Sequence, residues 1–311
     1  MQIFHQLEDF KDHKKPVILT IGNFDGVHLG HLAVLQRART FARDNSQLTV
    51  LTFSNHPSEV LRPEQPVPLL CTLKHKIQLL QMHSLQALVL LPFTRYLANH
   101  SAASFIERVR QFIPFTHLIL GHDATLGRDR QGNKSTMQQL ALEWGFTVHY
   151  VDEYRYEGQP VSSTRIRGLI QQGELGQAET LLGRPYSIYS HVLPGLGKGK
   201  QIGFPTANLE VRGLCLPPFG VYAVEVRKDN QSFRGIANLG LAPTVREDRT
   251  PLLEVHLLSS HPDFYEEPIE VIFEGFIRPE KKFESLEDLR RQIKQDIEQV
   301  KNLEKPHSLL E

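Results

Sequence analysis

The chain has 311 residues, with 35 acidic and 35 basic side chains and a formal net charge of zero at pH 7. This length favours two domains, and the balanced charge gives no electrostatic case for binding nucleic acid or a membrane surface. No apolar run approaches membrane-spanning length, and the N-terminus does not resemble a signal peptide. The two cysteines, Cys71 and Cys215, lack a CxxC partner, which argues against a zinc site or disulfide framework and favours a cytoplasmic protein.

The first half of the chain, from residue 17 to about 151, alternates short apolar runs with helical patterns. Strands that are apolar on both faces and joined by helices predict a parallel sheet covered on both sides. Ligands of such sheets bind beyond the carboxyl ends of the strands. The predicted strands are 17–21, 48–53, 87–91, 117–120 and 146–151, and the predicted helices are 31–43, 73–82, 102–112 and 136–144.

A polar loop joins the first predicted strand to the first helix within the stretch from Thr20 to His31. Its glycines let the backbone turn sharply and approach a bulky anion, and its two histidines lie on one side of the first helical turn. Because helix N-termini attract phosphate, we predict a nucleoside triphosphate site without a Walker lysine. The alternative is an ordinary strand-to-helix connection with surface histidines. The candidate residues are Gly22, Asn23, Phe24, Asp25, Gly26, His28, Gly30 and His31.

Three later segments offer further candidates. His56 precedes Pro57, which disfavours helical geometry, so this side chain either faces the same crevice or belongs to a solvated turn. The loop 121–127 follows a strand and combines glycines with charged residues, which makes it a plausible ligand loop. Ser162, Ser163 and Thr164 are suited to capping the helix that continues through Ile170, and capping alone would explain them.

The pattern changes to period two beyond Gly183, where we place the boundary between domains 1–183 and 184–311. Residues 169–182 before it are predicted to form a short helical connector. Several short strands without intervening helices predict an antiparallel sandwich or barrel. The predicted strands are 187–193, 221–226, 233–239, 252–258 and 269–273.

A final helix is predicted to begin at Ser285, whose spacing to Asp288 indicates a capping box. Its apolar stripe is predicted to pack on the barrel. The stripe consists of Leu286, Leu289, Ile293, Ile297 and Val300.

A glycine-rich segment with two lysines precedes Thr206 and Asn208. Alternating glycines and lysines favour folding over phosphates, although the spacing is not that of a Walker A loop. Thr206 and Asn208 lie two apart on an extended segment and offer oxygen ligands to Mg²⁺. Glu254 shares a strand face with His256, and by itself would be interpreted as a solvated charge. The candidate phosphate residues are Gly195, Gly197, Lys198, Gly199 and Lys200.

These motifs together resemble those of the bacterial bifunctional riboflavin kinase/FMN adenylyltransferases, or FAD synthetases. Residues 22–31 are similar to the HxGH signature of nucleotidylyltransferases, residues 162–167 to a Ser-Ser-Thr-x-Ile-Arg motif, and residues 203–208 to the riboflavin kinase sequence Gly-Phe-Pro-Thr-Ala-Asn. The resemblance runs from about residue 17 to 300. It implies an α/β Rossmann-like nucleotidylyltransferase domain, then an antiparallel β-barrel riboflavin kinase domain with a C-terminal helix.

The implied chemistry is ATP-dependent phosphorylation of riboflavin to FMN, followed by adenylylation of FMN to FAD with release of pyrophosphate. The resemblance assigns Ser163, Thr164 and Arg167 to phosphate binding, with Arg167 neutralising charge as pyrophosphate leaves. Mg²⁺ is implied for both reactions, and the substrates are small molecules.

In the second domain, the resemblance assigns Thr206 and Asn208 to the metal and the nucleotide phosphates. It makes Glu254 the base that accepts the proton of the ribityl hydroxyl of riboflavin. The residues assigned to the flavin are Asp123 in the first domain and Arg278 in the second.

The loop 121–127 departs from the family pattern, because Ala124 and Leu126 stand where the family has two aromatic residues. Loss of both rings removes apolar contact and stacking surface for a flavin. Two alternatives therefore remain: a riboflavin kinase whose first domain is impaired or acts on another acceptor, and a non-catalytic flavin- or nucleotide-binding regulator. The sequence leaves open self-association, the preferred redox state of the flavin, and direct passage of FMN between sites.

Overall fold

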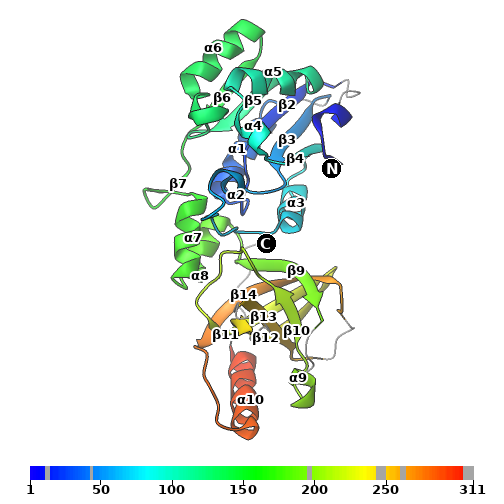
Figure 1. Cartoon of the computed structure of the whole chain (residues 1–311), viewed down its shortest axis with the longest axis vertical. Coiled ribbons are helices and arrows are strands. Elements are labelled where there is room, and N and C mark those ends of the chain that lie inside the picture. The colour runs from blue at the N-terminus through cyan, green and yellow to red at the C-terminus, as the bar shows by residue number, and fades with distance from the viewer. Residues whose placement is uncertain (11–14, 43–44, 195–197, 243–249, 260–263, 304–311) are drawn as a thin grey trace. The chain divides into compact units, whose positions relative to one another are not determined.

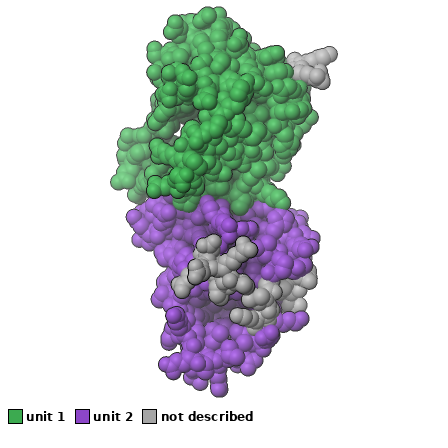
Figure 2. Space-filling view, viewed as in Figure 1, with its two compact units in different colours: residues 1–165 green, residues 166–311 purple. Residues whose placement is uncertain are grey.

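A computed structural model describes most of the chain as two compact units, unit 1 (residues 1–165) and unit 2 (residues 166–311), which are coloured separately in Figure 2. The described residues are 1–10, 15–42, 45–194, 198–242, 250–259 and 264–303, with the backbone alone for Lys198 and Ala242. The candidates Gly195 and Gly197 lie outside the described residues.

Unit 1 contains a parallel six-stranded sheet in the order β1-β4-β3-β2-β5-β6. All five strands predicted for this half are present, and the parallel arrangement is confirmed. The additional strand, β1, is only three residues long, too short for a periodic pattern. The strands are β1 Gln2–Phe4, β2 Val17–Ile21, β3 Gln47–Phe53, β4 Ala87–Leu91, β5 Phe115–Gly121 and β6 Thr147–Val151.

Helices cover both faces of this sheet, as predicted from strands that are apolar on both sides (Figure 1). One buried cluster joins the sheet to α5 and α6, and the other joins it to α1 and α3. Helix α1 ends at Arg39, before the predicted end at Arg43, which lies outside the described residues. The helical segments are η1 Leu7–Phe10, α1 Leu29–Arg39, α2 Pro57–Leu61, α3 Leu73–Gln81, α4 Arg95–Ala98, α5 Ala102–Phe112, η2 Arg128–Arg130 and α6 Lys134–Trp144.

The strand order reverses beside β2. The chain proceeds from β2 to β3 to β4 on one side of the sheet, and then β5 pairs with the opposite edge of β2. The loops after β2 and β5 therefore flank a topological switch point, where ligands of open α/β sheets bind.

A two-stranded hairpin (β7 Arg155–Tyr156 and β8 Gln159–Pro160) leads into α7, Ser163–Gln171, and α8, Leu175–Leu182. The division between the two units falls within α7. Most of the predicted helical connector over 169–182 is helical, but it is divided between the end of α7 and α8, because the chain breaks at Gly173, whose φ of +82° is left-handed.

Unit 2 is built on a closed antiparallel barrel in the order β10-β13-β12-β11-β14-β9, which confirms the predicted class. Strand β10 lies inside the stretch that the sequence singled out for chemistry and was not predicted as a strand. The remaining elements are β9 Ser187–Leu193, α9 Lys198–Gln201, β10 Ala207–Glu210, β11 Gly220–Lys228, β12 Gln231–Ala242, β13 Thr250–Leu257, β14 Pro268–Arg278 and α10 Leu286–Asn302.

The last helix, α10, covers part of the outside of the barrel. Its N-cap is Ser285, as predicted, and the Ser285 hydroxyl accepts a hydrogen bond from the backbone N–H of Asp288. The Asp288 carboxylate accepts from that hydroxyl at 2.7 Å, whereas the predicted capping box would have it accept from the backbone N–H of Ser285. Val300 packs with Val221 and Ala223, so β11 is buried on both faces. The predicted packing of the whole stripe is wrong at Leu286, which is 68% exposed, since the described contacts lie toward the other end of the helix.

Candidate functional site

The loop after β2 holds three residues in the left-handed backbone region: Phe24 at φ 52°, Gly26 at 78° and Val27 at 40°. Phe24 and Val27 are each 2% exposed, so their packing holds a conformation that side chains other than glycine rarely adopt. Such strain is typical of ligand loops, and it lies at the end of the strand where phosphate binding was predicted.

His28 and His31 form a reciprocal capping arrangement at the start of α1. The Nδ1 of His28 accepts from the backbone N–H of His31 at 3.4 Å, and the Nδ1 of His31 accepts from the N–H of His28 at 3.3 Å. Their ring centroids are 3.7 Å apart. With Nδ1 as acceptor, a neutral imidazole carries its proton on Nε2. The pair is therefore arranged as two Nε2 donors beside a helix N-terminus.

Asp25 connects the loop to the segment that contains Leu70 and Cys71. Its carboxylate is 4% exposed, and both oxygens accept from the backbone N–H of Leu70, at 3.0 and 3.1 Å. The N–H of Gly26 donates to the Sγ of Cys71 at 3.3 Å. Asp25 was predicted among the residues that bind ATP; the contacts described for it support the shape of the loop.

Lys76 is a polar residue of this region that the sequence analysis missed. It lies on α3, is 6% exposed, and donates from Nζ to the carbonyl oxygens of Asn23 and Phe53. Its burial could have been inferred from the sequence, because Lys76 lies on the apolar face of a predicted helix, three and four residues before Leu79 and Leu80.

The second predicted phosphate motif contacts the first one. The hydroxyl of Ser163 donates to the backbone carbonyl of Asp25 at 3.2 Å. A Cβ at Gly30 would lie 3.1 Å from the carbonyl of Val161, so glycine permits this close approach. Thr164 is exposed, and Arg167 lies one helical turn after Ser163, 9% exposed and in the portion of α7 assigned to unit 2.

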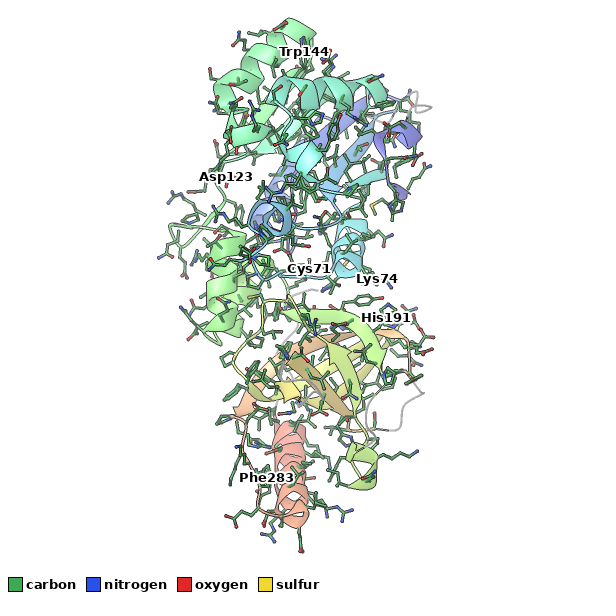
Figure 3. The ribbon with its side chains drawn as sticks, in the orientation of Figure 1. Cys71, Lys74, Asp123, Trp144, His191 and Phe283 are labelled. Carbon is green, nitrogen blue, oxygen red and sulfur yellow. The ribbon has the colours of Figure 1, made fainter. Side chains whose placement is uncertain are left out.

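A cavity of about 570 Å³ opens in unit 1 among the loops that follow β2, β3, β4 and β5. Of the predicted residues, it is lined by Gly22, Asn23, Phe24, His31 and Asp123, the last labelled in Figure 3. His56 is not among the lining residues. It caps α2, with its Nδ1 accepting from the N–H of Ser58.

The aromatic wall of this cavity comes from elements other than the loop 121–127, where the family pattern has its aromatic residues. Ala124 and Leu126 line it, and so do Phe53, Phe93 and Phe105. Phe53, the last residue of β3, and Phe93, two residues after β4, meet edge to face with centroids 5.2 Å apart. The cavity therefore presents aromatic surface although the loop 121–127 has none.

In unit 2 the strand register aligns a row of residues across five strands. Asn208 on β10 pairs with Glu254 on β13, and Glu254 pairs with Asn238 on β12. Asn238 pairs with Val221 on β11, and Val221 pairs with Arg278 on β14. Directly paired residues of antiparallel strands project from the same face, so the predicted metal ligand, base and flavin residue share one side of the barrel.

The segment before β10 folds back on itself. A Cβ at Gly199 would lie 2.4 Å from the carbonyl of Phe204 and 3.1 Å from the Oγ1 of Thr206, so glycine is needed there. His256 binds the same segment, with its Nδ1 2.8 Å from the carbonyl oxygen of Pro205. The glycine-rich stretch and Thr206 are thus adjacent; Thr206 and Lys200 are exposed.

Arg278 is held by α10. Its guanidinium donates to both carboxylate oxygens of Asp296 at distances of 2.8 to 3.0 Å, and Asp296 is 2% exposed. Gln292 also donates to Asp296, at 2.9 Å. The guanidinium is therefore oriented before any ligand binds.

The oxygen donors of the row, together with Thr206 just before β10, suit a hard cation. A hydroxyl at Thr206, an amide oxygen at Asn208 and the neighbouring carboxylate of Glu254 belong to the ligand types that Mg²⁺ prefers. Throughout the described ranges, there is no cluster of three or more His, Cys, Asp or Glu residues arranged to hold a metal. Sites of few protein ligands are usual where Mg²⁺ also binds substrate phosphates.

Comparisons with known proteins match both units. A family model described as FAD synthetase matches residues 10–165, and one described as riboflavin kinase matches residues 182–304. A bifunctional riboflavin kinase/FMN adenylyltransferase of Haemophilus influenzae is 38% identical over 97% of this chain and 98% of that protein. The protein of the same description from Pseudomonas fluorescens is 35% identical over 98% of this chain and 99% of its own length.

A solved structure has a similar fold over nearly the same extent. A crystal structure described as a macrolide-efflux protein from Streptococcus pneumoniae covers 97% of this chain and 99% of its own, with a TM-score of 0.82 and 28% identity. Within the part of the present chain that the structure describes, no helix has the length and apolar character required to cross a membrane.

Proposed function

The chain belongs to the family of bifunctional riboflavin kinase/FMN adenylyltransferases, and we propose that its two sites divide the two reactions between them. Riboflavin and ATP give FMN and ADP at the barrel, and FMN and a second ATP give FAD and pyrophosphate at the parallel sheet. The observation that carries this division is the presence of two separate predicted phosphate motifs, residues 22–31 in unit 1 and residues 199–208 in unit 2, each within the match to a different family model.

For adenylyl transfer, we assign the nucleotide to the loop after β2 and the start of α1. A phosphate oxygen of FMN attacks the α-phosphorus of ATP, and pyrophosphate departs. The nucleophile is already an anion, so the protein has to position two like-charged groups and stabilise the charge that develops between them. The Nε2 donors of His28 and His31 suit this task, and Arg167 and Thr164 are assigned to the departing phosphates.

For the acceptor, we assign FMN to the cavity bounded by the loop 121–127. Phe53 and Phe93 supply aromatic surface that favours a flavin even though Ala124 and Leu126 do not. Asp123 also lines the cavity and is assigned to the flavin. This wall supports the bifunctional reading over a first domain that is impaired or acts on a different acceptor.

For the kinase reaction, Glu254 is assigned as the base, because the neutral ribityl hydroxyl of riboflavin is a poor nucleophile until it loses a proton. Thr206 and Asn208 would hold Mg²⁺, which supplies charge neutralisation at the ATP phosphates when bound. Lys198 and Lys200 are assigned to the same phosphates. Arg278, oriented by Asp296, is assigned to the flavin.

We place the functional boundary near Gly183. The riboflavin kinase match begins at residue 182. Helix α8 ends at Leu182, and Gly183 caps it in the left-handed conformation. The two cysteines are buried thiols that are not joined in a disulfide, which favours a reducing cytoplasm. The balanced charge of 35 acidic and 35 basic residues favours small-molecule substrates over nucleic acid.

The test is to incubate the purified chain with ATP, Mg²⁺ and either riboflavin or FMN, and to separate the flavins by chromatography. We expect FMN and then FAD from riboflavin, and FAD directly from FMN. FMN without FAD, even when FMN is supplied, would contradict the assignment to unit 1. Binding of flavin and nucleotide without either product would leave only a regulator.

A further inference from the structure

Lys76 is buried beneath the phosphate loop of unit 1. It is 6% exposed, and its Nζ lies 2.7 Å from the carbonyl oxygen of Phe53 and 3.1 Å from that of Asn23. Phe53 is the last residue of β3, and Asn23 lies in the loop two residues after the adjacent strand β2. One ammonium group therefore ties together two of the strand ends that line the cavity.

The carbonyl of Asn23 is fixed from two directions. The hydroxyl of Thr52 donates to it at 3.0 Å, in addition to the bond from Lys76. The next residue, Phe24, has the left-handed φ of 52°. A strained loop persists only where its surroundings determine its conformation, and these two donors hold the peptide that enters the strained segment.

We propose that Lys76 is a positioning residue for adenylyl transfer, whose ammonium group holds the loop from Gly22 to Val27 in the conformation that receives the phosphates of ATP. This inference rests on the function proposed for unit 1. Lys76 acts through Asn23 and the backbone, and the Nε2 donors of the two histidines remain the groups assigned to substrate.

The charge of Lys76 fits this position. Burial lowers the pKa of Lys76, whereas Cys71, Asp25 and Glu59 act in the opposite direction and favour the charged form. A buried cation is costly unless it is fully hydrogen-bonded. The two carbonyl partners and the nearby acidic groups explain why a lysine is stable at this site.

The experiment compares three variants in both reactions of the full chain. Lys76→Met keeps the aliphatic stem and removes every donor, and Thr52→Val removes only the hydroxyl that donates to Asn23. Lys74→Met is the matched control, because Lys74 is an exposed lysine two residues away on the same helix, labelled in Figure 3. Initial rates of FAD formation are measured while ATP and FMN are varied separately, alongside FMN formation from riboflavin.

We expect Lys76→Met to lower kcat/KM for ATP in adenylyl transfer by about 10- to 100-fold, as displacements near 1 Å cause in positioned reactions. The kinase reaction should be unchanged, and the KM for FMN should be unchanged in Thr52→Val, which leaves the bond from Lys76 to Phe53 in place. Thr52→Val should produce a smaller loss in kcat/KM for ATP, and Lys74→Met should produce none. An unchanged kcat/KM for ATP in Lys76→Met would overturn the proposal.

A loss in Lys76→Met without any loss in Thr52→Val would also overturn it, because the restraint on Asn23 would then not matter. If Lys76→Met fails to fold, as judged by circular dichroism, Thr52→Val decides: a selective loss in kcat/KM for ATP supports the proposal and no loss overturns it. If the wild-type chain forms no FAD, that result contradicts the function proposed for unit 1. It is distinguishable from a failure of the role proposed for Lys76, which is judged by comparing the variants with an active wild type.

Discussion

The two sites of this protein are assembled in different ways. In unit 1, the candidate residues lie on the loops after parallel strands and at the start of α1. The conformation of the loop after β2 depends on the buried Lys76 and Asp25 and on the half-buried Ser163. In unit 2, Asn208 and Glu254 lie on paired strands of a barrel, and the ladder itself sets their positions. A site on loops should therefore be sensitive to changes beneath it, whereas a site on a ladder should depend mainly on the residues of the row.

The largest expected effect is in the row of unit 2. Glu254→Gln removes the assigned base, so FMN formation should fall on the order of 10²- to 10⁴-fold, the usual contribution of general base catalysis. FAD formation from supplied FMN should be unchanged. Glu210→Gln, at the exposed end of β10, is the control and should alter neither rate. Full kinase activity in Glu254→Gln, measured by flavin chromatography, would remove Glu254 from the reaction.

The next effect is at the helix start of unit 1. His31→Ala removes one assigned donor to the transferring group, and FAD formation should fall roughly 10²- to 10³-fold, as when one donor to a developing charge is lost. FMN formation should be preserved. Asn208→Ala should give the reverse when FMN is supplied. If either change removed both activities from a folded protein, the division between the sites would be wrong.

A third change tests the support beneath the loop. Asp25→Ala leaves the buried N–H of Leu70 without its acceptor, which should lower the unfolding free energy of unit 1 by about 1–3 kcal/mol. Adenylyl-transfer activity should be lost at a lower urea concentration in Asp25→Ala than in the wild type. The urea concentration at which kinase activity is lost should be the same in both proteins. Glu107→Ala, on an exposed position of α5, is the control. Unaltered resistance to urea would mean that Asp25 does not support the loop.

A smaller effect is expected for Asp296 on α10, which binds Arg278 of the row in unit 2. Asp296→Asn weakens the charged bonds that orient Arg278, and the KM for riboflavin should rise up to about tenfold, which corresponds to roughly 1.4 kcal/mol. Little change is expected in kcat. Glu298→Gln, exposed on the same helix, should have no effect. A change in kcat alone would contradict a role for Arg278 in flavin binding.

The smallest effect is the pH dependence of stability in unit 1. The pKa of Lys76 is lowered by burial from its ordinary value of 10.5, so the folded state binds fewer protons than the unfolded state between the lowered pKa and 10.5. The contribution of Lys76 to the unfolding free energy of unit 1 should therefore rise with pH between the lowered pKa and 10.5. Urea unfolding of unit 1 at a series of alkaline pH values should show this slope in the wild type and not in Lys76→Met. Equal slopes in both proteins would exclude Lys76 as its source.

The sequence was sufficient for features that depend on local pattern. Apolar runs such as Val17–Ile21 and period-two stretches such as 221–226 record which faces are buried, so they predicted the parallel sheet and the barrel. The strand-to-helix motif at Thr20–His31 and the Thr206–Asn208 pair were recognisable because their residues are close in the chain. The hidden outer face of β11 was not predicted, because α10 covers it from a distant part of the sequence.

Only the tertiary structure decided which distant residues meet. Strand register brings Asn208, Glu254 and Arg278 into one row, and nothing local in the sequence specifies the pairing of five strands. Chain folding likewise brings Phe93 and Ala124 to the wall of one cavity and places the Nζ of Lys76 within hydrogen-bond distance of the Asn23 carbonyl. These contacts depend on packing and hydrogen bonds between segments far apart in the chain, whereas a sequence pattern reports burial and periodicity one segment at a time.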